Sequence, residues 1–215
     1  MISANEASGH PDAGSKRSFT DAFIGHAHRI LQAGYQRLSA ADYHASEEDE
    51  ITGDLAFEMN EVLTNSRESW MRMFQVHDQH PVTPPGGPKS VRRVGKRRSK
   101  IDLQFVANSK SGFHRFSWEA KRLGPNHTIR AYLGAAGMGC FLSGQYASDC
   151  DFGGMLGYAQ TGDASSWLDI LTKKLDNAVS KLATPESSRP TLRSVHLRTS
   201  VGRDVAIYHT ILRFN

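Results

Sequence analysis

Two stretches separated by a short polar spacer decide the fold: residues 101–106 read IDLQFV and residues 113–123 read FHRFSWEAKRL. Both are in part β-branched and aromatic, a composition that favours strands. The spacer, residues 107–112, reads ANSKSG and is typical of a turn. We therefore predict two adjacent strands that pair as a hairpin.

The predicted hairpin carries two acids and a lysine toward one end. Asp102 lies at the start of the first strand, and Glu119 and Lys121 lie near the end of the second. Residues two apart in a strand point to the same side, so Glu119 and Lys121 face one way together. Asp102 joins them if the strands pair as a hairpin. Carboxylate oxygens are ligands that Mg²⁺ prefers, and a lysine beside them can stabilise negative charge or orient an attacking water.

These residues resemble the signature of the PD-(D/E)xK nucleases, which is an acid followed, on the next strand, by (D/E)-x-K. The resemblance spans roughly residues 46–160 and implies a three-layer α/β/α restriction-endonuclease-like core with a mixed central sheet. It also implies that Asp102 and Glu119 bind Mg²⁺, with Mn²⁺ as a substitute, and that the carbonyl of Ala120 assists them. Lys121 would then aid the nucleophile or the transition state.

A helix before the hairpin is expected to supply a further acid to the metal. Ser46 and Asp49 form a capping box, which predicts a helix from about residue 47 to residue 69. Acids in its first turn are explained by the helix dipole. We assign the metal-binding role to Glu50, because it borders the apolar face and the resemblance implies a Glu near the start of this helix; Asp54, one turn later, is the reserve.

One element that the resemblance requires has no good candidate in the sequence. A strand is expected between the acidic helix and Asp102, but residues 79–100 are rich in proline and basic residues. A short strand near residues 90–94 is the best available prediction.

The rest of the chain alternates further helices and strands, as expected for a mixed α/β domain. We predict one domain over residues 18–215, preceded by a flexible tail over residues 1–17. The predicted helices cover residues 19–38, 128–147 and 167–182, and the predicted strands cover residues 152–160, 195–197 and 205–214.

Positive charge is concentrated next to the hairpin. The net charge of the whole chain is only +4, yet residues 89–100 hold seven Lys and Arg residues and no acid. Such a run favours a polyanion as partner, although a solvated loop would explain it too. The residues expected to contact nucleic acid are Arg92, Arg93, Lys96, Arg97, Arg98 and Lys100.

Composition argues against several other classes of protein. Cys140 and Cys150 form no CxxC pair, so neither a disulfide framework nor a cysteine zinc site is expected. The ten histidines show no convincing set of metal ligands and are interpreted as surface or packing residues. No apolar run is long enough for a membrane helix, and we expect a cytoplasmic protein.

The sequence thus predicts a Mg²⁺-dependent endonuclease that hydrolyses phosphodiester bonds, with double-stranded DNA the expected substrate. A role in bacterial restriction or anti-phage defence is implied by the resemblance alone. Two alternatives stay open: a nuclease subunit that needs a partner protein for recognition, and a non-catalytic nucleic-acid-binding or assembly module. Cleavage of both strands would favour a homodimer. Taken alone, Glu119 and Lys121 would be interpreted as an ordinary ion pair on an exposed strand. Phe116, Trp118 and Leu123 indicate instead that this strand is substantially buried, and a charged pair in such a strand needs a reason.

Overall fold

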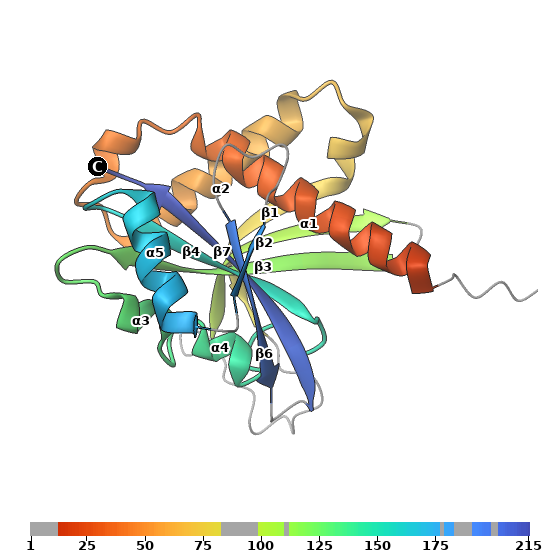
Figure 1. Ribbon diagram of the computed structural model, residues 1–215. Helices are drawn as coiled ribbons and strands as arrows, with labels where there is room; N and C mark the ends of the chain where they lie inside the picture. The colour runs from red at the N-terminus through yellow and green to blue at the C-terminus, as the bar shows by residue number, and fades with distance from the viewer. Residues whose placement is uncertain (1–12, 83–98, 110–111, 177–178, 183–190, 199–201) are drawn as a thin grey trace, which may run out of the picture.

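The computed structural model describes residues 13–82, 99–109, 112–176, 179–182, 191–198 and 202–215. Within them, seven strands form one mixed sheet in the order β1-β2-β3-β4-β7-β6-β5 (Figure 1). The strands are β1 Phe74–Pro81, β2 Lys100–Ser109, β3 Gly112–Leu123, β4 Phe152–Ala159, β5 Val179–Leu182, β6 Thr191–Arg198 and β7 Arg203–Arg213.

Parallel pairing is confined to the centre of the sheet. Strands β3, β4 and β7 run parallel, whereas β1-β2-β3 on one side and β7-β6-β5 on the other pair antiparallel. A parallel pair needs a crossover connection. Two short helices lie between β3 and β4 in the chain, and α5, β5 and β6 lie between β4 and β7.

Helices cover both faces of the sheet, as Figure 1 shows. Helices α1 (Ala13–Tyr35) and α2 (Glu48–Asn65) share one buried apolar cluster with β1, β2 and β3. Helices α3 (Ile129–Leu133), α4 (Gly139–Leu142) and α5 (Ala164–Leu175) share a second cluster with β4 and β7. Single 3₁₀ turns, η1 (Ala40–Tyr43) and η2 (Ser69–Met73), flank α2. The mixed α/β class predicted from the sequence is therefore confirmed.

Close packing of α1 against α2 fixes the position of the acidic helix. Ile51, Leu55 and Met59 of α2 are fully buried. A Cβ at Gly34 of α1 would lie 2.6 Å from Cγ of Met59, so only glycine lets the two helices approach this closely. The buried apolar face of α2, which the sequence indicated, thus fixes the position of the helix, including its first turn, against the sheet.

Several predicted elements are confirmed. They are the hairpin, the strand over residues 152–160, the two closing strands, the helix over residues 19–38 and the start of the acidic helix. Helix α1 begins at Ala13, inside the stretch expected to be a flexible tail. Helix α2 ends at Asn65, a few residues before the predicted end.

The helix predicted over residues 128–147 is wrong as a single element. Helix α3 stops at Leu133, and the chain turns before α4 begins at Gly139. A Cβ at Gly137 would lie 2.3 Å from the carbonyl oxygen of Tyr132, which shows how tightly this turn folds back. The glycines that the sequence presents as a small-residue face instead interrupt the helix.

The last turns predicted for the helix over residues 167–182 are also wrong. Helix α5 ends at Leu175, because Asp176 adopts a left-handed backbone with φ of 48°. Val179 then pairs with Ser194 as part of β5. The residues after Asp176 that helical spacing assigned to this helix, Val179 to Leu182, therefore pair in the sheet as β5.

The strand missing between the acidic helix and Asp102 is β1, which was not predicted at residues 74–81. Its pairing with β2 runs from Phe74 opposite Ala107 to Pro81 opposite Lys100. Within β1 only Phe74 and Val76 are buried apolar residues, so the alternation of apolar and polar residues that indicates a strand extends over just three positions. The alternative position near residues 90–94 lies outside the described residues.

Candidate functional site

The two acids and the lysine meet at one end of the β2–β3 hairpin. The antiparallel pairing reaches Leu103 opposite Trp118, and Asp102 and Glu119 are the next residues beyond that pair. On the other side of β2, the ladder with β1 passes from Asp78 to His80, and the intervening Gln79 has a positive φ of 47°. The hairpin therefore brings the two carboxylates together where the neighbouring edge strand is distorted.

Asp102 is held in place by the backbone of β3. Its Oδ2 accepts a hydrogen bond from the N–H of Ala120 at 2.8 Å, and the side chain is buried. Burial raises the pKa of Asp102, and the positive charge of Lys121 and the Ala120 N–H only partly oppose that rise. The hydrogen bond from Ala120 thus fixes the orientation of the Asp102 carboxyl. The positive charge near that carboxyl is not enough to offset its burial.

Lys121 is the centre of the cluster. Its Nζ donates to Oε1 of Glu119 at 2.8 Å, to Oε1 of Glu48 at 2.8 Å and to the carbonyl oxygen of Ala120, and it lies 3.9 Å from Oδ2 of Asp102. Burial lowers the pKa of Lys121, but the three surrounding carboxylates raise it by more. Its ammonium therefore stays charged throughout the neutral range.

Glu119 is the least compensated member of the cluster. Its Oε1 receives the Lys121 hydrogen bond, whereas Oε2 is buried with no hydrogen-bond partner in the described part of the chain. Burial and then the charge of Asp102 raise the pKa of Glu119 to about 8, against the opposing effect of Lys121. An unpartnered carboxylate oxygen in a buried site is unfavourable unless something else compensates it.

The acid that α2 brings to the site is Glu48. Its Oε1 contacts Lys121, and its Oε2 accepts from the backbone N–H of Arg122 at 3.2 Å. Glu50, the residue assigned from the sequence, is exposed, and Asp54 accepts a hydrogen bond from the hydroxyl of Tyr43. On this geometry the first-turn acid at position 48 replaces Glu50 as the candidate from the helix.

The physical reason lies in the start of α2. The N-cap is Glu47 rather than Ser46, and no side chain caps the helix there, so the predicted capping box is wrong. The carbonyl of Ser46 instead accepts a hydrogen bond from the side chain of Gln160 at 2.8 Å. This contact ties the chain just before α2 to the residue that follows β4, and Glu48 in the first turn then contacts Lys121 and the N–H of Arg122.

Segments around α4 also border the cluster. Burial and then the charge of Glu119 raise the pKa of the Cys140 thiol to about 11, and the same two causes raise the pKa of Tyr146. The hydroxyl of Tyr146 donates to the carbonyl of Lys100 at 2.5 Å. Cys140 and Tyr146 are therefore near enough to the cluster for its charge to affect their pKa values.

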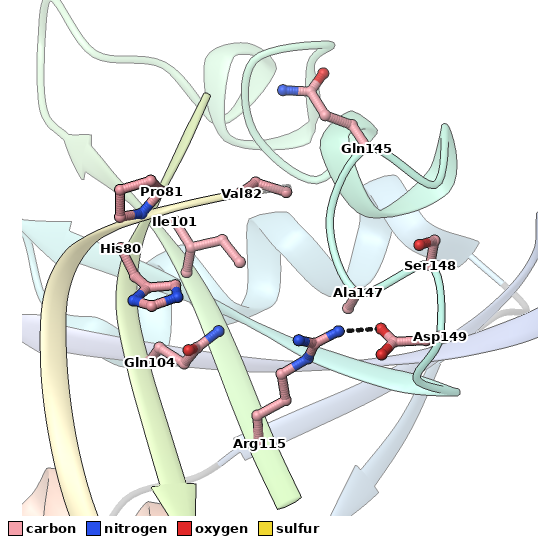
Figure 2. A pocket seen from close by; sticks show the side chains of 10 residues that line it. All are labelled: His80, Pro81, Val82, Ile101, Gln104, Arg115, Gln145, Ala147, Ser148 and Asp149. Atoms are coloured by element: carbon pink, nitrogen blue, oxygen red, sulfur yellow. Dashed lines mark hydrogen bonds and ion pairs between the residues drawn. The ribbon is translucent and has the colours of Figure 1, made fainter. Parts of the chain in front are cut away.

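Figure 2 shows a pocket of about 140 Å³ whose lining includes Ile101 and Gln104, which lie on either side of Asp102 in β2. Its polar lining includes Gln104 of β2, Arg115 of β3 and, after α4, Gln145 and Asp149. The sequence analysis did not single out Gln104 or Arg115. Strict alternation would have found Gln104, because residues two apart share a face and Asp102 was already identified.

Of the expected nucleic-acid contacts, only Lys100 falls within the described residues, where it is exposed at the start of β2. The others, Arg92, Arg93, Lys96, Arg97 and Arg98, lie outside the described residues. Their role stays a prediction.

The donor set of the cluster fits a hard divalent cation. Asp102, Glu119 and the carbonyl of Ala120 are all oxygen donors, as Mg²⁺ prefers. With every group ionised, the three carboxylates outnumber the one ammonium and leave an excess of two negative charges. A search of the described residues found no group of three or more His, Cys, Asp and Glu already arranged around a metal position. The Lys121 ammonium lies among the carboxylates instead.

Comparison with known proteins found no matching family model, no matching curated protein and no matching solved structure. None of the helices described here is both long enough and apolar enough to span a membrane.

Proposed function

We propose that this protein is a metal-dependent nuclease of the PD-(D/E)xK type, with a restriction-endonuclease-like core, that hydrolyses phosphodiester bonds of DNA. The order of elements supports the proposal: an acidic helix, the strand β1, the hairpin that carries Asp102 and Glu119-Ala120-Lys121, further helices and then β4. Helices on both faces of the mixed sheet agree with the same core.

One observation carries the proposal more than any other. Asp102, Glu119 and Glu48 converge on a single lysine from three different elements, and Glu119 keeps one buried oxygen without a partner. An ordinary surface ion pair has one acid and one base and is well hydrated. A buried excess of carboxylate charge is an expensive arrangement that proteins use at sites that bind cations or reactive groups.

Each residue of the cluster has a distinct task in the proposed reaction. Asp102, Glu119 and the Ala120 carbonyl would hold Mg²⁺, which supplies positive charge at the scissile phosphate and activates a water for in-line attack. Lys121 presents its ammonium to the developing negative charge of the phosphate. Glu48 and the Ala120 carbonyl orient that ammonium, and the N–H of Ala120 fixes Asp102.

DNA is the proposed substrate because the chain places a strongly basic run directly before Asp102. Lys and Arg residues bind the phosphate backbone without reading its sequence. Restriction or anti-phage defence is the role that we propose on the resemblance alone.

The test is cleavage of supercoiled plasmid by the purified full-length chain in Mg²⁺, in Mn²⁺ and in EDTA. We expect cleavage with either metal and none in EDTA. Glu119→Gln should lose cleavage, whereas the matched control Glu58→Gln, which changes an acid of α2 that pairs with Arg37, should retain it. Undiminished cleavage in EDTA, or full activity of Glu119→Gln, would refute the proposal.

Calorimetric titration with Mn²⁺ provides a readout that does not depend on activity. The wild type and Glu58→Gln should bind the ion, and Asp102→Asn and Glu119→Gln should bind it much more weakly. Equal Mn²⁺ binding by all four proteins would mean that the cluster is not the metal site.

A further inference from the structure

The face of the hairpin that carries Asp102 and Glu119 is polar from Asp102 to Gln104 on β2 and from Arg115 to Glu119 on β3. On β2, Asp102 and Gln104 alternate with core residues, and on β3, Arg115, Ser117 and Glu119 do the same. Gln104 and Ser117 are buried and are joined by a hydrogen bond from Nε2 to Oγ at 3.2 Å. Polar groups on a buried sheet face need a reason, and two of these residues, Gln104 and Arg115, line the pocket in Figure 2.

The charges that line the pocket are balanced. Among the described residues of the lining, Arg115 is the only lysine or arginine, and Figure 2 shows it reaching across to the carboxylate of Asp149, with which it forms an ion pair. A phosphate would need a cation that is not already neutralised. The described part of the lining therefore favours an uncharged group over an anion.

Apart from His80 and Ser148, the rest of the described lining combines amide groups with apolar surface. Gln104 and Gln145 each carry both a donor and an acceptor, and Pro81, Ile101 and Ala147 supply apolar walls. A nucleobase is planar and uncharged, has apolar faces and carries donors and acceptors along its edges. Glutamine side chains are well suited to such edges, above all to adenine.

The wall of the pocket that follows α4 is rigidly held. Arg198, which is fully buried, donates to the carbonyls of Ala147 at 2.8 Å and Cys150 at 2.7 Å. Arg203 donates to the carbonyl of Ser148 at 2.6 Å. Charge-assisted bonds to three successive parts of one segment give a pocket that is formed before any ligand arrives.

The pocket also lies close to the acid–lysine cluster. Gln104 follows Asp102 by two residues on the same face of β2, a separation of roughly 7 Å along a strand. A base bound at Gln104 would therefore leave its own sugar and phosphate near Asp102 and Glu119.

From this geometry we propose that the pocket lined by Gln104, Gln145 and the Arg115–Asp149 pair binds one unstacked nucleobase of the substrate strand, next to the phosphate that is cleaved. The inference rests on the proposed nuclease function and adds to it a base-binding subsite. A duplex substrate would have to extrude that base, which is why proteins that do so provide hydrogen bonds and apolar walls for it.

Binding of the four deoxynucleoside 5′-monophosphates in EDTA tests the pocket without any cleavage. We expect at least one of them to bind about tenfold more tightly than deoxyribose 5-phosphate, which lacks the base. Gln104→Leu and Gln145→Ala should each abolish that difference. Gln75→Leu makes the same chemical change at an exposed position of β1 outside the pocket and should leave the difference intact.

Equal binding of deoxyribose 5-phosphate and all four nucleotides would overturn the proposal, as would a preference that survives both pocket variants. Gln145 is exposed, so its variant should fold even if the buried Gln104 variant does not. A short homopolymer of the preferred base should displace the nucleotide. Failure to displace it would assign the pocket to free nucleotides and overturn the strand assignment.

The nucleotide assay also separates this proposal from the proposed nuclease function. A protein that cleaves plasmid with Mg²⁺ but shows no preference for a base retains the nuclease proposal and loses the pocket proposal. A protein that prefers a base but never cleaves retains a base-binding pocket and loses the nuclease.

Discussion

Two buried polar clusters lie in different halves of the same sheet. The acid–lysine cluster consists of Glu48, Asp102, Glu119 and Lys121 at the β2–β3 end. The histidine cluster consists of Tyr132, Ser194, His196 and His209, and it joins α3 to β6 and β7. In the histidine cluster, Nε2 of His209 lies 2.7 Å from Oγ of Ser194 and Nδ1 lies 3.2 Å from the hydroxyl of Tyr132. Both ring nitrogens are therefore partnered.

The two clusters differ in charge more than in burial. Burial, with a smaller effect from His196, lowers the pKa of His209 to about 3, so its ring is neutral at neutral pH. Glu119 has a raised pKa because its charge is buried beside another carboxylate. A satisfied neutral network specifies and stabilises a core, whereas an unbalanced charged cluster costs stability and is retained for what it binds.

The largest expected difference between the clusters is in activity. Glu119→Gln should lower plasmid cleavage per mole of folded protein about a hundredfold or more, because it removes a group that holds the metal. His209→Gln should leave the rate unchanged within about twofold, since no hydrogen bond among the described residues joins the histidine cluster to the acid–lysine cluster. Initial rates in Mg²⁺ measure both. A similar loss of cleavage rate in the two variants would show that the two clusters do not differ in function.

Stability should change in the opposite sense. His209→Ala should lower the free energy of unfolding by about 3 kcal/mol, because it opens a cavity and leaves the hydroxyls of Ser194 and Tyr132 without this partner. Glu119→Gln should raise it by about 1 kcal/mol in EDTA near neutral pH, because the buried Glu119 carboxyl, with its pKa raised to about 8, has to take up a proton in the folded state and glutamine does not. Urea unfolding followed by tryptophan fluorescence measures both. A destabilised Glu119→Gln would mean that the acid–lysine cluster stabilises the fold.

Acid should unfold the protein partly through the histidine cluster. The folded-state pKa of His209 is about 3, well below the unfolded value near 6.5, so between these limits the unfolded state binds more protons. Stability is therefore lost as the pH falls from 6.5 toward 3, by at most about 1.4 kcal/mol per pH unit for this residue. His209→Gln should show a shallower dependence across that window. An identical slope in wild type and variant would contradict the buried neutral histidine.

Metal addition should affect only one cluster. Mn²⁺ at about ten times its dissociation constant should stabilise the wild type by about 1.4 kcal/mol relative to EDTA, seen as a rise in the thermal midpoint. The same rise is expected for His209→Gln and none for Glu119→Gln. A rise of equal size in Glu119→Gln would place the bound metal elsewhere.

The smallest effect distinguishes two acids within α2. Glu48→Gln should lower cleavage about tenfold, because Lys121 loses a partner that orients it. Glu50→Gln should change neither cleavage nor stability, the latter within about 0.5 kcal/mol, because Glu50 is exposed. If Glu50→Gln were inactive and Glu48→Gln active, the assignment made from the sequence would stand against the geometry.

Most of the individual strands could be predicted from local pattern. Alternation and β-branched residues located the hairpin, the strand over residues 152–160 and the two closing strands. Strand β1 could not be found in this way, because its outer half reads HDQHP and owes its extended form to pairing with β2. Val179 and Leu182 fit helical spacing but lie in β5, since sheet pairing outweighs a weak local preference.

The sequence by itself determined that Glu119 and Lys121 share a face and that Asp102 comes near them, because the two-residue period of a strand and the short spacer of a hairpin are local properties. Tertiary structure alone decided which acid of α2 joins them. The capping pattern indicated Ser46 as the N-cap of the helix, but the N-cap is Glu47, and the carbonyl of Ser46 accepts a hydrogen bond from Gln160, 114 positions away. Packing of Gly34 against Met59 fixes the helix, and Glu48 rather than Glu50 then contacts Lys121. Contacts between distant residues carry no local period, so no pattern in the sequence could have revealed them.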